Sequence, residues 1–171
     1  MEPTSSRVEL VDEVDEADRV LRRVTRREMR DKNLLHRVAA VLCRDSRGRI
    51  YVHRRTAIKD LFPSLYDMFC AGTVSAGESY VQTAQRELSE ELGIRGGTPE
   101  FLFHHRYQGA HTRSHTHVFR VTWDGPIVHQ ASEISWGEFR SYEEIAANRD
   151  GFEFVPDGAE LFARYTAECI R

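Results

Sequence analysis

The pattern of apolar and polar positions along the chain predicts strands interleaved with a few helices. Alternating or β-branched apolar runs predict six strands: 8–14, 37–44, 50–54, 101–107, 117–123 and 133–139. Turn-forming residues at 45–49 join the second and third of these as a hairpin. Helical spacing or helix boundaries mark three segments: 25–33, a segment from Ser141, and a segment after Pro156. This order of elements indicates an α/β fold with a mixed sheet.

The most regular helical pattern lies between Ser79 and Gly93. Ser79 and Gln82 have the spacing of a capping box, which places the helix start, and Gly93 supplies the stop. Apolar residues recur at three- and four-residue intervals and form the expected buried stripe: Val81, Ala84, Leu88 and Leu92. With that stripe turned inward, acidic residues occupy a neighbouring face of the helix.

Three carboxylates crowd that neighbouring face. Glu87, Glu90 and Glu91 stand at positions i, i+3 and i+4, so their like charges repel one another. We expect no protein cation close enough in sequence to neutralise them. Two interpretations stay open at this point. Either the face is solvated, as acidic runs on exposed helices often are, or a hard divalent cation binds there.

Length and composition restrict the class of protein. With 171 residues, 40% of them hydrophobic, the chain is expected to form a single domain over 1–171, with residues 1–7 disordered. A formal net charge of −3 gives no positive field that would hold nucleic acid, so none is expected as a partner. We expect a small-molecule partner instead, and a monomer is slightly favoured over a homodimer.

The sequence also gives no reason to expect a membrane partner. The first residues are acidic where a signal peptide would be basic, and the longest apolar run, 38–43, is too short to span a bilayer. A cytoplasmic location is therefore expected. The three cysteines, Cys43, Cys70 and Cys169, lie far apart in the chain and are expected to be free thiols.

The spacing of residues 72–94 identifies a candidate family. Fixed residue types follow one another at fixed intervals: Gly72, five residues, Glu78, seven residues, Arg86-Glu87-Leu88, one residue, Glu90-Glu91, one residue, Gly93-Ile94. This pattern resembles the complete box of the Nudix hydrolases, with every specified position filled. The resemblance implies a Nudix-type α/β/α sandwich with a mixed β-sheet and a loop-helix-loop catalytic motif. It also implies metal-dependent hydrolysis of a pyrophosphate bond in a nucleoside diphosphate derivative.

The resemblance assigns metal-binding roles to several box residues. Glu87, Glu90 and Glu91 are implied to bind Mg²⁺, for which Mn²⁺ is a possible substitute. Either Glu90 or Glu91 is implied to deprotonate the attacking water. Gly72 either offers its carbonyl oxygen to the metal or only permits a bend in the backbone, and both interpretations stay open.

Two other box residues are implied to brace the motif. Glu78 in the loop and Arg86 in the helix carry opposite charges, and the resemblance implies that they pair with each other. Such a pair would fix the loop against the helix. Arg86 is for this reason counted with the catalytic residues.

Weaker motifs outside the box resemble the Nudix branch related to isopentenyl diphosphate isomerase. They are Leu35-His36-Arg37, His53-Arg54-Arg55, Lys59, Pro63 and Glu133 leading into a strand. Arg54, Arg55 and Lys59 are candidates for holding the substrate phosphates, because guanidinium and ammonium groups bind phosphate well. Solvated charges at a strand end are the alternative. Glu133 is a possible additional carboxylate of the site.

An isomerase is the alternative enzyme on this fold. It needs a cysteine immediately before the box glycine and a histidine immediately after it, where this chain has Ala71 and Thr73. Cys70 is displaced by one residue, which on a strand turns its side chain to the opposite face. The isomerase also needs two glutamates spaced i, i+2 on a later strand, and the best match here is His115-Thr-His117.

Three further questions concern whether the protein is a catalyst or only binds nucleotides, what the histidines do, and which substrate is used. A non-catalytic Nudix-fold nucleotide-binding module would be expected to lose box carboxylates, and none is lost here. The histidines between 104 and 117 suit a transition-metal cluster, substrate contacts or ordinary surface positions. Among substrates, nucleoside di- and triphosphates lead, while nucleotide sugars, dinucleotide cofactors and coenzyme A compete. The box does not decide between them, because loops and pocket residues set the substrate.

Overall fold

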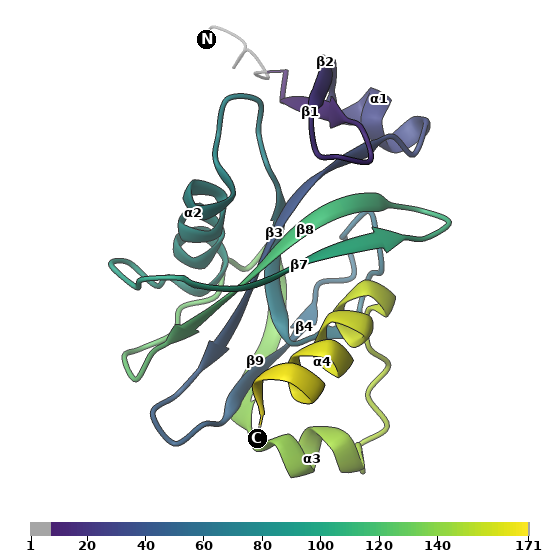
Figure 1. Cartoon of the computed structure of the whole chain (residues 1–171). Helices are drawn as coiled ribbons and strands as arrows, with labels where there is room; N and C mark the ends of the chain where they lie inside the picture. Colours follow the sequence, from purple (N-terminus) through teal and green to yellow (C-terminus); the bar gives the residue numbers. More distant parts are fainter. Residues whose placement is uncertain (1–7, 171) are drawn as a thin grey trace, which may run out of the picture.

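A computed structural model of the protein describes residues 8–170, so the expected disorder of residues 1–7 lies outside the described residues. The strands are β1 (Leu10–Val14), β2 (Val20–Thr25), β3 (Leu35–Arg44), β4 (Ile50–Arg55), β5 (Tyr66–Asp67), β6 (Phe69–Thr73), β7 (Glu100–Gln108), β8 (Arg113–Thr122) and β9 (Ile134–Arg140). The helices are α1 (Arg26–Asp31), α2 (Tyr80–Leu92), α3 (Tyr142–Ala147) and α4 (Pro156–Cys169) (Figure 1). Each predicted strand and helix is confirmed, whereas the pattern does not predict the short strands β2, β5 and β6.

The strands β3 to β9 form one mixed sheet built around β3. On one side β8 pairs with β3 in parallel, from Leu35 opposite Arg113 to Arg44 opposite Thr122, and on the other side β6 pairs antiparallel. β3 and β4 meet only at Arg44 and Ile50, so the predicted hairpin is confirmed at its turn, but its strands then separate. β4 pairs instead with β5 and β9. The sheet therefore has two halves, one formed by β3 with β6, β7 and β8, and the other formed by β4 with β5 and β9.

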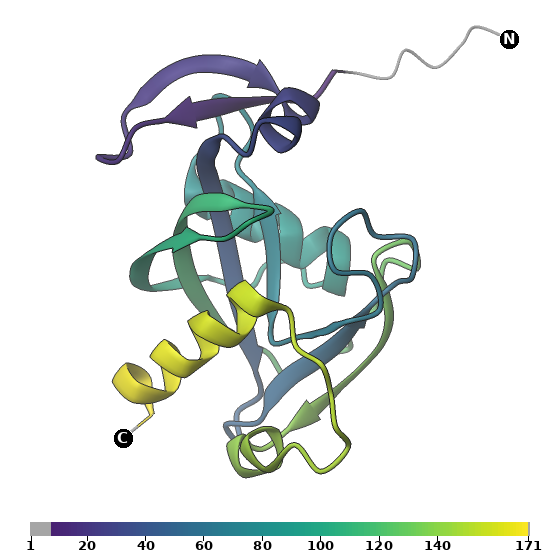
Figure 2. The same cartoon turned by 90° about the vertical axis from the view of Figure 1, so that its right-hand side faces the viewer.

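Helices cover both faces of this sheet. α2 lies on one face, and α3 and α4 lie on the other (Figures 1 and 2). The core under α2 includes Leu88 and Leu92, and the core on the opposite face includes Leu161 and Tyr165 of α4. The predicted α/β/α sandwich with a mixed sheet is thus confirmed.

Strand β3 is buried on both faces. Ala39 and Val41 belong to the core under α2, while Ala40 and Leu42 belong to the core under α3 and α4. A strand covered on both sides has no polar face, which explains the continuous apolar run at this point of the sequence. Among the described residues, no helix combines the length and apolar character needed to span a bilayer.

The first two strands and α1 form a separate layer at one end of the sheet (Figure 1). β1 and β2 pair antiparallel, and Thr25 at the end of β2 caps α1. Val11, Val24 and Met29 form a small core of this layer. Val11 also bridges to Ser75 in the loop before α2. This contact holds α1 and its basic residues near the box.

Candidate functional site

Helix α2 begins and ends where the sequence predicts. Ser79 and Gln82 exchange both hydrogen bonds of a capping box. Gly93 ends the helix in the left-handed region, with a φ of 66° that favours glycine. The capping residues therefore fix the register of the acidic residues between them.

The buried face of α2 differs from the predicted stripe at its first turn. Three of the four apolar positions are buried, but Val81 is 41% exposed, so that part of the prediction is wrong. Thr83 is fully buried instead, and its hydroxyl donates to Glu78 of the box loop at 2.7 Å. The first turn of the helix thus contacts the loop through Thr83 rather than through Val81.

The three carboxylates of α2 lie in different environments. Glu87 and Glu91 are each only 7% exposed, whereas the side chain of Glu90 is 52% exposed. Burial, together with the nearby Glu87 carboxylate, raises the pKa of Glu91 to about 8, and burial also raises the pKa of Glu87. The interpretation of a solvated acidic face is therefore wrong for two of the three residues. Two buried like charges need a proton or a cation beside them.

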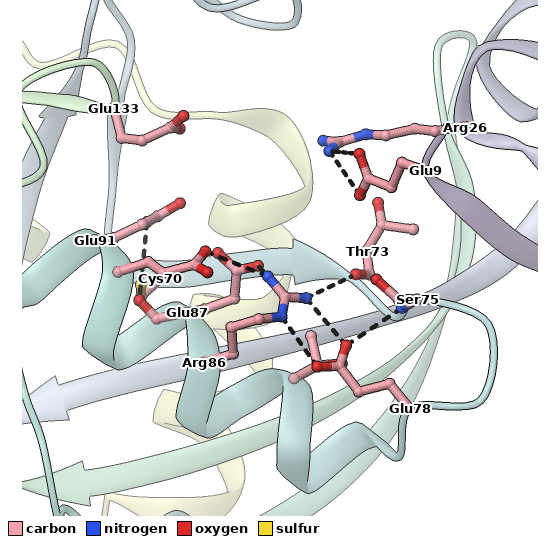
Figure 3. A network of polar contacts seen from close by, with 12 residues as sticks. Glu9, Arg26, Cys70, Thr73, Ser75, Glu78, Arg86, Glu87, Glu91 and Glu133 are labelled. Atoms are coloured by element: carbon pink, nitrogen blue, oxygen red, sulfur yellow. Dashed lines mark hydrogen bonds and ion pairs between the residues drawn. The ribbon is translucent and has the colours of Figure 1, made fainter. Parts of the chain in front are cut away.

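Arg86 supplies part of that positive charge and lies at the centre of the network in Figure 3. Its Nε and Nη2 donate to the two carboxylate oxygens of Glu78, at 3.0 and 3.1 Å. Its Nη1 donates to Glu87 at 2.6 Å and to Glu90 at 3.4 Å, and Nη2 donates to the Thr73 carbonyl at 3.4 Å. The hydrogen bonds to Glu78 raise the pKa of Arg86. The expectation that no protein cation neutralises the helix carboxylates is wrong, since Arg86 contacts two of them.

Gly72 lies near the end of β6, against the Glu87 side chain. A Cβ at this position would overlap the Glu87 carboxylate, so only glycine lets the two approach. Gly72 is not among the residues with positive φ, which speaks against a role as a mere bend. The structure thus favours close approach of the carboxylate as the reason for a glycine here.

Cys70 lies on the face of β6 that packs toward α2, whereas Ala71 packs with the opposite core. Its thiol donates to Glu91 Oε2 at 3.0 Å and to the Glu87 carbonyl at 3.3 Å. Burial, and then the Glu91 carboxylate, raises the pKa of Cys70, so the sulfur stays protonated. Cys70 therefore holds the Glu91 carboxylate through a hydrogen bond, and it faces away from the position that an isomerase would use.

A cavity of about 260 Å³ lies in front of these carboxylates. We call it the acidic cavity, and the residues that matter most in its lining are Gly72, Arg86, Glu87, Glu90, Glu91 and Glu133. Glu133 comes from the segment before β9, yet its carboxylate faces the same space (Figure 3). The structure thus brings the predicted box residues together with the one acidic residue predicted from outside the box.

The donor set of the acidic cavity suits a hard divalent cation. The carboxylate oxygens of α2 and of Glu133, together with the backbone at Gly72, are ligands of the kind that Mg²⁺ and Mn²⁺ prefer. Within residues 8–170, no three acidic, histidine or cysteine side chains already converge as a metal cage. Arg86 and Lys59 hold several of these oxygens in ion pairs. A cation that binds here therefore has to exchange with these pairs.

Basic residues from the end of β4 and from the loop after it lie opposite the carboxylates. Lys59 contacts the Glu133 carboxylate, and Arg55 donates to the Leu61 carbonyl at 3.0 Å. Lys59 lines the acidic cavity itself, and both residues line a more open cavity beside it. Two of the three predicted phosphate-binding residues are thus at the site.

Arg54 is the third predicted phosphate-binding residue, and it lies elsewhere. Its Nε donates to the Ser64 carbonyl at 3.0 Å, and its guanidinium lies 5.6 Å from the centroid of the Tyr66 ring. Arg54 lines neither of these two cavities. The pairing of β4 with β9 shifts register between Arg54 and Arg55, and only Arg55 lines the open cavity.

Helix α1 adds two cations that the sequence analysis missed. Arg26 lines the acidic cavity and pairs with Glu9 at 2.9 Å (Figure 3). Arg30 contacts Asp60 in the loop after β4 and lines the adjoining open cavity. Their i, i+4 spacing places both on one helix face, but no local signal says that this face meets the box.

The histidines of β7 and β8 lie away from the acidic cavity. His104 Nε2 and His115 Nδ1 are 2.8 Å apart, and His115 Nε2 lies 3.0 Å from the Asp15 carbonyl oxygen. His117 stacks on Tyr80 with ring centroids 3.6 Å apart. No third ligand joins the His104–His115 pair among the described residues, so a transition-metal cluster is not supported. The contact with Asp15 instead ties the sheet to the turn between β1 and β2.

Comparison with protein families and sequences gives one consistent result. A family model described as the NUDIX domain matches residues 34–161. An uncharacterized Nudix hydrolase of Streptomyces coelicolor is 44% identical over 165 residues, which cover 95% of this chain and 91% of that protein. Another, from Salmonella typhi, is 36% identical over 157 residues, covering 91% of this chain and 83% of that protein.

Solved structures agree on the fold. A protein from Deinococcus radiodurans matches with a TM-score of 0.80 and 29% identity, covering 95% of this chain and 100% of that one. A MutT protein from Methanosarcina mazei matches with a TM-score of 0.68 and 21% identity, covering 80% of this chain and 96% of that one. None of these four proteins is described as an isomerase, so the narrower resemblance to the isomerase branch receives no support from them.

Proposed function

Because the chain belongs to the Nudix family of hydrolases, we propose that its acidic cavity cleaves the pyrophosphate bond of nucleoside di- and triphosphates. A Nudix hydrolase acts on a pyrophosphate bond, and the family generally uses divalent metals. One observation supports this cavity as the place of reaction. Glu87 and Glu91 are buried beside Gly72, and two buried carboxylates are stable only with protons or cations beside them.

The proposed cofactor is Mg²⁺, with Mn²⁺ as a substitute. Its proposed ligands are four carboxylates and one backbone carbonyl: Glu87, Glu90, Glu91, Glu133 and Gly72. A bound cation neutralises charge on the pyrophosphate oxygens and so reduces their repulsion of an incoming nucleophile. Arg86 holds Glu78 and Glu87 in place, so that the loop and the helix keep their relative position.

Hydrolysis requires a base for the attacking water. We propose that Glu90 or Glu91 takes the proton as the water oxygen bonds to phosphorus. The bond from that phosphorus to the bridging oxygen then breaks, and the second phosphate group leaves with the electron pair. Both glutamates line the acidic cavity, one buried and one half-exposed, so separate variants are needed to decide between them.

The basic residues of the opposite wall are proposed to bind the substrate phosphates. Arg26 and Lys59 line the acidic cavity, and Arg30 and Arg55 line the open cavity beside it. Guanidinium groups bind phosphate oxygens in bidentate fashion, and an ammonium group adds a point charge. A polyanionic substrate is therefore attracted along this wall toward the carboxylates and their cation.

A substrate panel tests the proposal. The purified protein is incubated with Mg²⁺ and nucleoside di- and triphosphates, nucleotide sugars, dinucleotide cofactors and coenzyme A, and the products are separated. We expect the di- and triphosphates to be hydrolysed fastest, and excess chelator to abolish all turnover. Turnover that survives the chelator would contradict the metal mechanism. Binding of nucleotides without any turnover would instead support a non-catalytic module.

A further inference from the structure

The segment that joins β8 to β9 brings two residues to the acidic cavity. Gln130 and Glu133 both line this cavity, although neither belongs to the box. A turn links them, because the backbone N–H groups of Glu133 and Ile134 both donate to the Gln130 carbonyl, at 2.9 and 3.0 Å. We call residues 130–133 the Glu133 turn. The position of the Glu133 carboxylate therefore depends on the contacts that hold this turn.

The backbone of the box helix holds the start of the Glu133 turn. The N–H groups of Val128 and Gln130 donate to the carbonyl oxygens of Leu92 and Glu91, at 3.0 and 3.1 Å. These carbonyls lie in the last turn of α2, where a helix leaves its acceptors without partners of its own. Side chains alternate in exposure along this stretch. Val128 and Gln130 are exposed, whereas His129 between them is half-buried and is the side chain that turns toward the core.

His129 contacts Tyr51, which comes from β4. The phenol oxygen of Tyr51 and Nε2 of His129 are 2.5 Å apart. Tyr51 belongs to the core under α2, and burial raises its pKa to about 12. Burial also lowers the pKa of His129. A neutral phenol therefore meets a neutral imidazole near pH 7, and the two groups share one hydrogen bond.

Gly137 of β9 leaves the room that this contact needs. A Cβ at Gly137 would lie 2.5 Å from the Tyr51 phenol oxygen and 2.7 Å from its ring, so a larger residue would displace the phenol. Gly137 is not among the residues with positive φ, so close approach is the reason for a glycine here. Phe139 packs edge to face on Tyr51, with ring centroids 5.0 Å apart. The phenol is therefore fixed in the direction of the segment before β9.

Thr56, the residue after β4, holds the other end of the Glu133 turn. Its hydroxyl donates to the Ser132 carbonyl at 2.9 Å, and its backbone N–H donates to the Glu133 carbonyl at 3.0 Å. The Glu133 carboxylate itself contacts Lys59. Lys59 is proposed to bind the substrate phosphates, so it cannot hold that carboxylate when a substrate is bound. The contacts with Tyr51 and Thr56 remain in that state.

We propose that Tyr51, His129 and Thr56 are positioning residues that hold the Glu133 carboxylate at the metal site of the acidic cavity. This inference rests on the proposed function, in which Glu133 is a metal ligand. None of the three positioning residues lines the acidic cavity, so each acts through the Glu133 turn. A ligand whose backbone is already fixed loses less conformational entropy when the cation binds. Loss of one positioning contact should therefore weaken metal binding although every ligand is still present.

Binding of Mn²⁺ in the absence of substrate tests the proposal, because electron paramagnetic resonance measures the unbound ion. Tyr51→Phe keeps the packed ring and removes only the hydroxyl, and Thr56→Val removes a hydroxyl donor at similar volume. Each variant should bind Mn²⁺ about threefold to tenfold more weakly, the range that one hydrogen bond predicts. Tyr142→Phe, at the exposed start of α3, is the matched control and should bind Mn²⁺ as the wild type does.

A double-mutant cycle separates positioning from a general structural role. Glu133→Gln should itself weaken Mn²⁺ binding, because it removes a carboxylate ligand. If Tyr51 acts through Glu133, Tyr51→Phe should cause no further loss in the protein that already carries Glu133→Gln. A further loss as large as the one that Tyr51→Phe causes in the wild type would overturn the positioning role.

Hydrogen exchange without metal reports on the Glu133 turn directly and separates the two proposals. The amides of Glu133 and Ile134 should exchange about fivefold or more faster in Tyr51→Phe than in the wild type. Equal exchange rates would overturn the inference, and so would a Glu133→Gln variant that binds Mn²⁺ normally, even if the substrate panel shows hydrolysis. Faster exchange in a protein that binds no Mn²⁺ would support the hold on the turn and contradict the proposed metal mechanism.

Discussion

The two walls of the acidic cavity are built in different ways. The wall formed by α2 and β6 comes from one stretch of chain, residues 72–94, and presents carboxylates. The opposite wall comes from α1, the loop after β4 and the segment before β9, and it presents mostly cations. The ion pairs of Arg86 and Lys59 illustrate this difference. The first pairs with residues of its own motif, and the second pairs with Glu133 from far along the chain.

This difference separates the reaction from recognition of the substrate. Metal ligands and a base must keep a fixed geometry, and a helix with caps at both ends provides it within one short motif. The cations proposed to bind the substrate phosphates come from segments that meet only in the folded chain. We therefore expect changes on the α2 wall to lower kcat and changes on the opposite wall to raise KM.

The largest effect should come from the α2 wall. Glu90→Gln and Glu91→Gln should each lower kcat by at least about a hundredfold, because a neutral amide binds Mg²⁺ weakly. The melting temperature without metal should not fall, since Glu90→Gln removes one of several neighbouring like charges and Glu91→Gln replaces a buried carboxyl group, whose pKa is raised to about 8, by a neutral amide. Glu143→Gln, an exposed residue of α3, is the control. Near-normal turnover of both variants in a steady-state assay would contradict the assignment of this wall.

Arg86→Ala should affect both turnover and stability. The side chain contacts Glu78, Glu87, Glu90 and the Thr73 carbonyl, and its loss leaves the buried Glu87 without its cation. We expect the free energy of unfolding to fall by about 1–3 kcal/mol, with a clear loss of kcat. Arg27→Ala, whose side chain is 90% exposed, should change neither. Unchanged melting of Arg86→Ala would show that the network does not brace the loop.

The opposite wall should respond through KM. Arg55→Ala and Lys59→Ala each remove a cation beside the acidic cavity, and each should raise KM for a nucleoside triphosphate by about tenfold. Arg54→Ala is the matched control, because this neighbour of Arg55 lies outside both cavities. Equal effects at Arg54 and Arg55, measured in the same steady-state assay, would remove the distinction drawn between them.

A pH titration of stability examines Asp67, a buried carboxylate at the end of β5 that does not line the acidic cavity. The folded protein binds the Asp67 proton more tightly than the unfolded chain, because burial raises the pKa from 3.8 to about 7. This contribution to stability is complete below pH 4 and is lost as the pH rises toward 7. Asp67→Asn should therefore gain stability over the wild type across that range, by a few kcal/mol at most. Parallel melting curves from pH 4 to 8 would contradict the shifted pKa.

The smallest effect is expected at Cys70. Cys70→Ser replaces the thiol by a hydroxyl that can also donate to Glu91, so kcat should stay within about threefold of the wild type. Cys70→Val removes the donor while keeping the side chain apolar, and it should be the less active of the two. A folded but inactive Cys70→Ser would mean that the sulfur itself takes part in the reaction.

Much of the fold follows from local patterns. Helix α2 is specified by its caps, and β3 contains a long apolar run, so the sequence predicts both. The first part of β8 is polar, and the sequence predicts only its apolar second part. The short strands β5 and β6 are held by their partners rather than by their own composition. The exposure of Val81 is missed for a similar reason, since the contact of Thr83 with the box loop decides which side of the first turn is buried.

The residues of the site also differ in whether the sequence predicts them. The box positions predict which carboxylates meet, because all of them lie within one motif. Arg26 and Arg30 cannot be predicted, since a bridge between β1 and the box loop brings their helix to the site. Adjacent residues Arg54 and Arg55 look alike in sequence, and only the folded structure, in which β4 shifts register between them, shows that Arg55 lines the cavity and Arg54 does not.

The parallel pairing of β3 with β8 has a consequence for how the protein reaches its folded state. Leu35 pairs with Arg113, and the whole stretch 72–94 lies in the connection between the two strands. Pairings between distant parts of a chain form slowly, because the entropy of closing a long loop is lost before the new contacts stabilise the chain. A capped helix such as α2 can form early and transiently on its own, but its buried face has no sheet to cover until β3 finds its neighbours. Catalytic competence should therefore arrive with the slowest phase of refolding and lag behind the recovery of helical structure.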